Sequence, residues 1–127
     1  MAASGSMDGQ IKLWDLKTNQ LRQTCEGHGD GIVKLKWHPT DALLYSCSVD
    51  RTIRLWDART VSCVRTWHGH QDIVLDFDLS AYVKPICFSS SFLIDGCDHM
   101  CRDCKTIVSC SDDHTALVFR LDELEGN

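Results

Sequence analysis

Short runs of β-favouring residues, separated by turn residues, follow one another along most of this chain. The runs are rich in Val, Ile, Leu, Thr and Trp, and Gly, Asp, Asn and Pro lie between them, which is typical of short strands and tight turns. The pattern predicts strands over residues 2–6, 10–14, 21–25, 32–37, 43–48, 52–56, 62–67, 74–79, 106–111 and 116–121. We therefore expect an all-β chain.

The chain repeats itself at a spacing of 42 residues. Asp8–Asp15 matches Asp50–Asp57, and the pair Gly27-His28 matches Gly69-His70. Between these anchors the complete unit holds four predicted strands separated by turns. Two aligned copies make this a strong signal, unlike a single short motif.

A third copy is present at a different spacing. Thr106–Phe119 aligns with Leu43–Trp56 at an offset of 63, whereas Val74–Leu79 still aligns with Ile32–Trp37 at 42. The additional 21 residues must therefore lie between the first and second strands of that unit. The inserted segment is 82–104, which stands where the complete unit has a two-residue turn.

Gly-His near the start of a unit, Trp-Asp near its end and four short strands between them resemble the WD-repeat signature. The resemblance implies a β-propeller built of four-stranded antiparallel blades. The fold prediction is a partial WD-repeat β-propeller of about three blades, the first and last incomplete. The expected units are a partial blade of three strands, a complete blade, and a last blade without its outer strand: 1–26, 27–68 and 69–127.

Residues 32–79 and 105–119 resemble the C-terminal end of the angio-associated migratory cell protein family. The resemblance implies a propeller of the cytoplasm and nucleus, associated with cell migration and angiogenesis in vertebrates; a fungal relative escorts a ribosomal protein. The sequence departs from the family in lacking most N-terminal blades and in carrying the insertion. We expect the insertion to be an exposed rim loop, from a splice variant or from read-through in a gene model.

The WD-repeat resemblance also implies a buried hydrogen-bond network in each blade. The matching residues are His28, Ser46, Asp50 and Trp56 in the complete unit, His70, Ser109 and Asp113 in the last, and Ser4, Asp8 and Trp14 in the first. Phe119 replaces the tryptophan of the last unit, so that network lacks an indole donor. A histidine, a serine and an aspartate also occur in hydrolases, but a trio that recurs in each repeat indicates a structural device, and no oxyanion-hole signal accompanies it. We predict no enzyme.

Composition limits the partners. The net charge is −5 and no basic cluster is present, which argues against nucleic acid and suits a basic protein partner, although solubility alone would also explain it. No signal peptide or membrane span is recognisable, so we expect the cytosol or the nucleus. A propeller that stops short of a ring leaves one face bare at each end, which forfeits on the order of 10 kcal/mol. We therefore expect the chain alone to be marginally stable or prone to aggregate.

Eight cysteines in a chain without an export signal indicate reduced thiols, and we expect Cys47 and Cys110 to be buried. The candidate zinc ligands are Cys97, His99, Cys101 and Cys104, whose chemistry fits and whose crowded spacing argues against a site. We predict no metal and no cofactor.

Residues 56–59, Trp-Asp-Ala-Arg, resemble the motif by which many WD-repeat proteins dock onto the damaged-DNA-binding adaptor of cullin-4 ubiquitin ligases. Arg59, beside Asp57, would pair with a partner carboxylate; the alternative is a solvated arginine in a turn. The leading hypothesis is a non-catalytic scaffold for protein–protein interactions, and the second is a substrate receptor of such a ligase.

Overall fold

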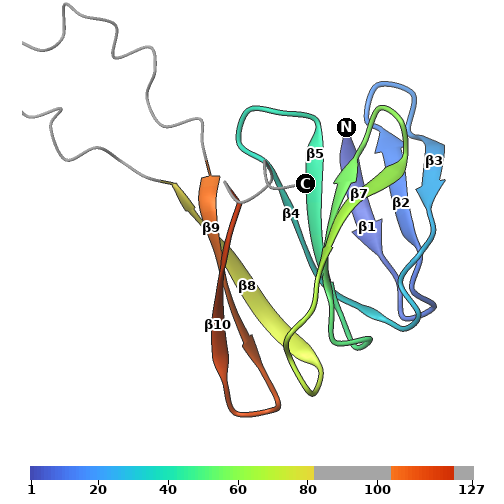
Figure 1. Ribbon diagram of the computed structural model, residues 1–127. Coiled ribbons are helices and arrows are strands. Elements are labelled where there is room, and N and C mark those ends of the chain that lie inside the picture. The colour runs from blue at the N-terminus through green and yellow to red at the C-terminus, as the bar shows by residue number, and fades with distance from the viewer. Residues whose placement is uncertain (82–103, 122–127) are drawn as a thin grey trace, which may run out of the picture.

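The computed structural model describes residues 1–81 and 104–121, and all the regular structure in that part is antiparallel β-sheet (Figure 1). The described strands are β1 (Ala2–Gly5), β2 (Ile11–Asp15), β3 (Gln20–Cys25), β4 (Ile32–Trp37), β5 (Leu43–Ser48), β6 (Ile53–Asp57), β7 (Ser62–Trp67), β8 (Val74–Ala81), β9 (Cys104–Ser111) and β10 (Ala116–Arg120). The predicted strands differ from these by no more than about two residues at either end.

The strands form three sheets in chain order, β1-β2-β3, β4-β5-β6-β7 and β8-β9-β10, and each strand pairs with the next. Figure 1 shows the sheets standing face to face, with the four-stranded sheet in the middle. The first strand of the middle sheet, β4, contacts both β1 and β8. The prediction of a partial propeller is confirmed: the sheets are blades, and the first and last contain three strands each among the described residues.

The middle sheet is buried on both faces because side chains alternate along its strands. In β5, Leu44 packs against Ile11 and Leu13 of the first sheet. The next residue, Tyr45, packs against Phe77 and other apolar residues of the last sheet. Each such side chain contributes roughly 1.5–3 kcal/mol when it leaves water. The two interfaces between sheets are therefore the cores of the molecule.

The last sheet has one covered face and one open face. Val108 and Val118 are 44% and 65% exposed, although Tyr45 and Leu55 at the equivalent positions of the middle sheet are buried. Cys110 is also exposed, so the expectation that it is buried is wrong, whereas Cys47 is buried as expected. The physical reason is that β8 covers Cys47, and no sheet in the described part covers Cys110.

Strands β8 and β9 are neighbours in one sheet although residues 82–103 separate them in sequence. Their register runs from Val74↔Ser111 to Ala81↔Cys104. The insertion therefore leaves the strand order of the sheet unchanged.

The described residues also include no helix that is long and apolar enough to cross a membrane.

Candidate functional site

His28 lies at the centre of a hydrogen-bond network in the middle sheet. The loop between β3 and β4 carries this residue, and its ring is buried. Its Nδ1 atom is 2.7 Å from Asp50 Oδ2, and its Nε2 atom is 2.7 Å from Ser46 Oγ. Trp56 Nε1 donates to the same Ser46 oxygen at 2.8 Å. The arrangement fits a neutral imidazole that donates from Nδ1 to Asp50 and accepts the Ser46 hydroxyl proton at Nε2.

Asp50 anchors the network because it accepts several hydrogen bonds. Its Oδ1 accepts from the backbone N–H of Thr52 at 3.0 Å and from the Thr52 hydroxyl at 2.6 Å, and its Oδ2 accepts from the Gly29 N–H at 3.1 Å. Burial alone would raise the pKa of Asp50, but the bonds from Thr52, His28 and Gly29 outweigh it and lower that pKa to about 2. Burial lowers the pKa of His28, and this effect outweighs the opposing hydrogen bond to Asp50. The pair therefore favours ionised aspartate and neutral histidine at neutral pH.

The residue before His28 must be glycine because a larger side chain would not fit there. Gly27 has a φ of 151°, and a Cβ atom there would lie 2.9 Å from Arg54 Nη1 and 3.1 Å from the Trp56 ring. The backbone therefore lies directly against the indole that Ser46 holds. Gly-His and Trp, which the sequence places far apart, form one packed unit.

The last sheet repeats the network with one member missing. His70 Nδ1 is 3.0 Å from Asp113 Oδ2, and His70 Nε2 is 2.7 Å from Ser109 Oγ. Hydrogen bonds, first from Thr115, lower the pKa of Asp113 against the opposing effect of burial. Phe119 stands where the middle sheet has Trp56 and offers Ser109 no N–H donor.

The first sheet retains the indole bond. Trp14 Nε1 donates to Ser4 Oγ at 2.9 Å. Asp8 accepts from the Gln10 N–H at 2.9 Å, and this bond is the largest cause of its lowered pKa. No histidine of the described residues reaches this pair.

The distances around His28 resemble those of a serine hydrolase, but the surroundings do not. Ser46 has no exposed surface, and its oxygen already accepts from an indole. A nucleophile must reach a substrate carbonyl. This serine cannot, so the trio is not a catalytic triad.

Arg59 lies on a rim of the propeller, just after β6. Its side chain is 73% exposed, and its Nε and Nη2 atoms donate to the two oxygens of Asp57, both at 3.2 Å. The same turn is tied to the turn before β5 by a bond from the Ala58 N–H to the Ala42 carbonyl at 2.9 Å. The guanidinium is therefore accessible to solvent, and two of its N–H groups already donate to the Asp57 carboxylate.

The structure describes the side chain of none of the four zinc candidates. Cys97, His99 and Cys101 lie outside the described residues, and so does the side chain of Cys104. Within the described ranges, no group of three or more His, Cys, Asp or Glu side chains could hold a metal ion.

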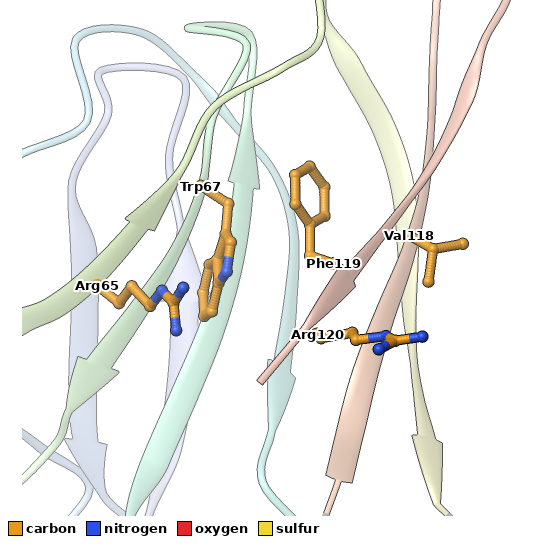
Figure 2. A pocket seen from close by; sticks show the side chains of 5 residues that line it. All are labelled: Arg65, Trp67, Val118, Phe119 and Arg120. Carbon is orange, nitrogen blue, oxygen red and sulfur yellow. The ribbon is translucent and has the colours of Figure 1, made fainter. Parts of the chain in front are cut away.

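The sequence reasoning missed a groove between β7 and β10. Arg65 and Trp67 of β7 line it on one side, and Val118, Phe119 and Arg120 of β10 line it on the other (Figure 2). Its volume is about 290 Å³. We call it the β7–β10 groove. The available signal was Arg120, which occupies the place that Asp15 and Asp57 hold in the other two units.

Comparison with known proteins matches residues 1–15 and 19–57 to the family model described as WD domain, G-beta repeat. The chain is 37% identical over 119 residues to the angio-associated migratory cell proteins of Canis lupus familiaris and Homo sapiens. That match covers 94% of this chain and 22% of each relative, so the chain spans about a fifth of their length. It is also 36% identical over 44 residues, 35% of this chain and 12% of the relative, to the U5 small nuclear ribonucleoprotein 40 kDa protein of Dictyostelium discoideum.

Proposed function

The chain carries WD repeats and is related in sequence to angio-associated migratory cell protein, and from this premise we propose that it is a non-catalytic scaffold that binds other proteins. The observation that carries the proposal is the burial of the reactive side chains. Histidine and serine are buried and bonded in two successive sheets, at matched positions. The histidine and serine side chains of the described part thus stabilise individual blades, and the exposed rims remain available to partners.

The proposed structural units are the ones that the repeat spacing predicts. Residues 1–26 form a partial blade, 27–68 a complete blade, and 69–127 a last blade with an insertion at 82–104. In each unit the network residues stabilise the blade and contact no partner. Support comes from the grouping of strands into three sheets.

A finer role is part of the same proposal. We propose that the chain acts in cell migration or in escorting a basic ribosomal protein, in the cytoplasm and nucleus. The net charge of −5 supports a basic partner. Three relatives bear the printed name angio-associated migratory cell protein, which supports the first role.

The second candidate function is a substrate receptor of a cullin-4 ubiquitin ligase, and the exposure of Arg59 favours it. Docking would require the guanidinium to exchange Asp57 for a carboxylate of the adaptor. The Arg59→Ala variant should then lose adaptor in a pull-down. Equal recovery of the adaptor by both proteins eliminates this function.

The scaffold proposal is tested by proximity labelling in cells. The chain is fused to a labelling ligase and compared with a rim variant, Asp41→Lys with Arg59→Glu, whose changed side chains are exposed. We expect the wild type to label a specific set of proteins, and the rim variant to lose at least half of that set with an unchanged unfolding midpoint. A wild-type set identical to that of the ligase alone contradicts the proposal.

A further inference from the structure

The turn between β4 and β5 contains an imidazole with little exposed surface, which serves as a hydrogen-bond acceptor. His38 follows β4 directly, and its side chain is 7% exposed. The backbone N–H groups of Thr40 and Asp41 both donate to its Nδ1 atom, at 3.3 and 3.2 Å. An imidazole nitrogen that accepts hydrogen bonds carries no proton, so these bonds require the neutral ring. The ring thus closes the turn in the way that an Asn or Asp side chain closes an Asx-turn.

The same nitrogen lies beside an acidic side chain. Asp41 Oδ2 is 3.3 Å from His38 Nδ1, and the Asp41 side chain is 62% exposed. An ionised carboxylate at this distance favours a protonated imidazole. A protonated Nδ1, however, donates a hydrogen bond and can no longer accept from the two backbone N–H groups. The turn therefore has two alternative sets of hydrogen bonds, and the protonation state of one ring selects between them.

The surroundings of His38 hold the ring in place, so the change is confined to the turn itself. Tyr45 of β5 stacks on the ring, with 6.4 Å between the ring centres and 29° between the planes. The backbone N–H of His38 donates to the Leu43 carbonyl at 2.8 Å. Among the described residues, the acid–base groups that the structure places against this ring are Asp41 of the same turn and Tyr45. Tyrosine is uncharged near neutral pH, so Asp41 is the charged group that responds to the ring.

The turn also acts on the part of the rim that carries Arg59. A backbone hydrogen bond joins the two turns. The bond to Asp57 is the largest cause of the raised pKa of Arg59, and the negative charge of Asp41 adds to it. Asp41 therefore interacts with a cation on one side and with the imidazole on the other. A proton on the imidazole would direct Asp41 towards His38 and leave less negative charge near Arg59.

We propose that the turn at residues 38–42 is a pH-sensitive switch on the rim of the propeller. A proton from solvent binds His38 Nδ1, the backbone N–H groups of Thr40 and Asp41 are released, and the imidazolium pairs with the Asp41 carboxylate. Histidine is the side chain whose charge ordinarily changes between pH 5 and pH 8, so the switch operates in that range. Its consequence for partners rests on the proposed scaffold function, because the same rim would present Asp41 and Arg59 to them.

The test is a pH titration of the full 127-residue chain by amide and imidazole NMR, from pH 8 to pH 5. The observed signals are the backbone amides of Thr40 and Asp41 and the ring of His38. In His38→Asn an amide oxygen takes the place of Nδ1 and accepts the same bonds without titrating. Asp41→Asn removes the carboxylate and leaves the histidine. The matched control is His114→Asn, an exposed histidine in the turn between β9 and β10.

We expect the amide signals of Thr40 and Asp41 to shift with the same midpoint as the His38 ring. Exchange of these two amides with solvent, corrected for its intrinsic pH dependence, should become at least tenfold faster below that midpoint, because their acceptor is lost. Both effects should vanish in His38→Asn and persist in His114→Asn. In Asp41→Asn the midpoint should move to lower pH, because the imidazolium has lost its partner.

The proposal is overturned if the amides of Thr40 and Asp41 do not respond while the His38 ring takes up its proton, or if the ring stays neutral down to pH 5. A shift that remains in His38→Asn, or an unchanged midpoint in Asp41→Asn, also overturns it. Proximity labelling judges the scaffold function separately. A turn that titrates in a chain without specific labelled partners would keep the switch and reject the scaffold. Labelled partners with a turn that does not respond to pH would do the reverse.

Discussion

At the scale of residues, one hydroxyl joins three parts of the middle blade. Ser46 of β5 accepts from Trp56 of β6 and lies at hydrogen-bond distance from His28, which precedes β4. Ser109 of the last blade has the histidine bond alone among the residues that the structure describes. The two serines therefore form a natural pair for measuring what the indole bond contributes.

Replacing Ser46 with alanine should cost about 2–3 kcal/mol of unfolding free energy, because a buried indole N–H and a buried imidazole both lose a partner. Ser109→Ala should cost about 1–2 kcal/mol, since His70 alone loses one. Urea unfolding followed by circular dichroism gives both values, and exposed Ser62→Ala is the control. Equal losses at the two serines would show that the indole bond contributes nothing.

Acidification should destabilise the fold in two stages. The folded pKa of His28 is lowered, so below about pH 6.5 the unfolded chain takes up a proton first and stability falls. The folded pKa of Asp50 is about 2, below the usual value near 4, so its contribution is present above about pH 4 and is lost as the pH falls towards 2. Urea midpoints between pH 8 and pH 3 test this. A midpoint that rises between pH 7 and pH 5 contradicts the first stage, and Asp50→Asn should flatten the second.

The network residues could be placed from sequence because their spacing repeats. His28, Ser46 and Trp56 recur as types at fixed offsets, and the structure brings them within hydrogen-bond distance. The β7–β10 groove could not be found that way, because its two sides meet only when separate sheets pack. The pairing of Arg59 with Asp57 was missed too, since the two interpretations of the guanidinium were a partner carboxylate and solvent, and neither was a carboxylate of the same turn.

At the scale of elements, strands bounded by clear turn residues were the most predictable. The bounds of β4, β5 and β7 match the prediction at both ends. Strand β9 begins at Cys104, earlier than predicted, because β8 pairs with it as far as Ala81. That pairing is a contact between segments distant in sequence, and no local pattern contains it.

Restoring the tryptophan should stabilise the last sheet. In Phe119→Trp the new indole would donate to Ser109, as Trp56 does to Ser46, and should add about 1 kcal/mol to the unfolding free energy. The gain should disappear in a Ser109→Ala background. A gain of the same size in that background would assign the effect to apolar packing.

The turn between β5 and β6 is strained at one position. Arg51 has a φ of 73°, and the equivalent residue of the first unit is Gly9, with a φ of 84°. A side chain pays about 1 kcal/mol or more in this region, which glycine enters freely. Arg51→Gly should therefore stabilise the chain by about 0.5–1 kcal/mol in urea unfolding, whereas Arg22→Gly within β3 should destabilise it. If Arg51→Gly destabilises the chain as Arg22→Gly does, the backbone at Arg51 is not strained.

At the scale of the whole molecule, the described sheets have unequal surroundings. The middle sheet has a neighbour on each face, and the last sheet presents Val108 and Val118 to solvent. Lys34 and Lys36 of β4 pair with Asp76 and Asp78 of β8, which adds ionic contacts between the first strands of these two sheets. These pairs are partly exposed and contribute little each. Apolar burial therefore dominates the attachment of one sheet to the next.

The open face should make the isolated chain associate. Replacing Val108 with Thr and Val118 with Lys places polar groups on that face and on the edge strand. We expect light scattering of a concentrated solution to fall severalfold while the unfolding midpoint stays within experimental error. The control pair, Val64→Thr and Leu21→Lys, is exposed elsewhere and should leave scattering unchanged. A lower unfolding midpoint in the protein with Val108→Thr and Val118→Lys would mean that these two valines contribute to packing within the chain.

The pairing of β8 with β9 has a practical consequence for engineering. The 22 positions from 82 to 103 join two strands whose backbones are already in register, where β4 and β5 are joined by only five, 38 to 42. Loop-closure entropy rises with the logarithm of length, so the longer connection costs only about 1 kcal/mol more. This position between β8 and β9 is accordingly the place to graft a displayed epitope or a reporter domain without redesigning the sheet beneath it.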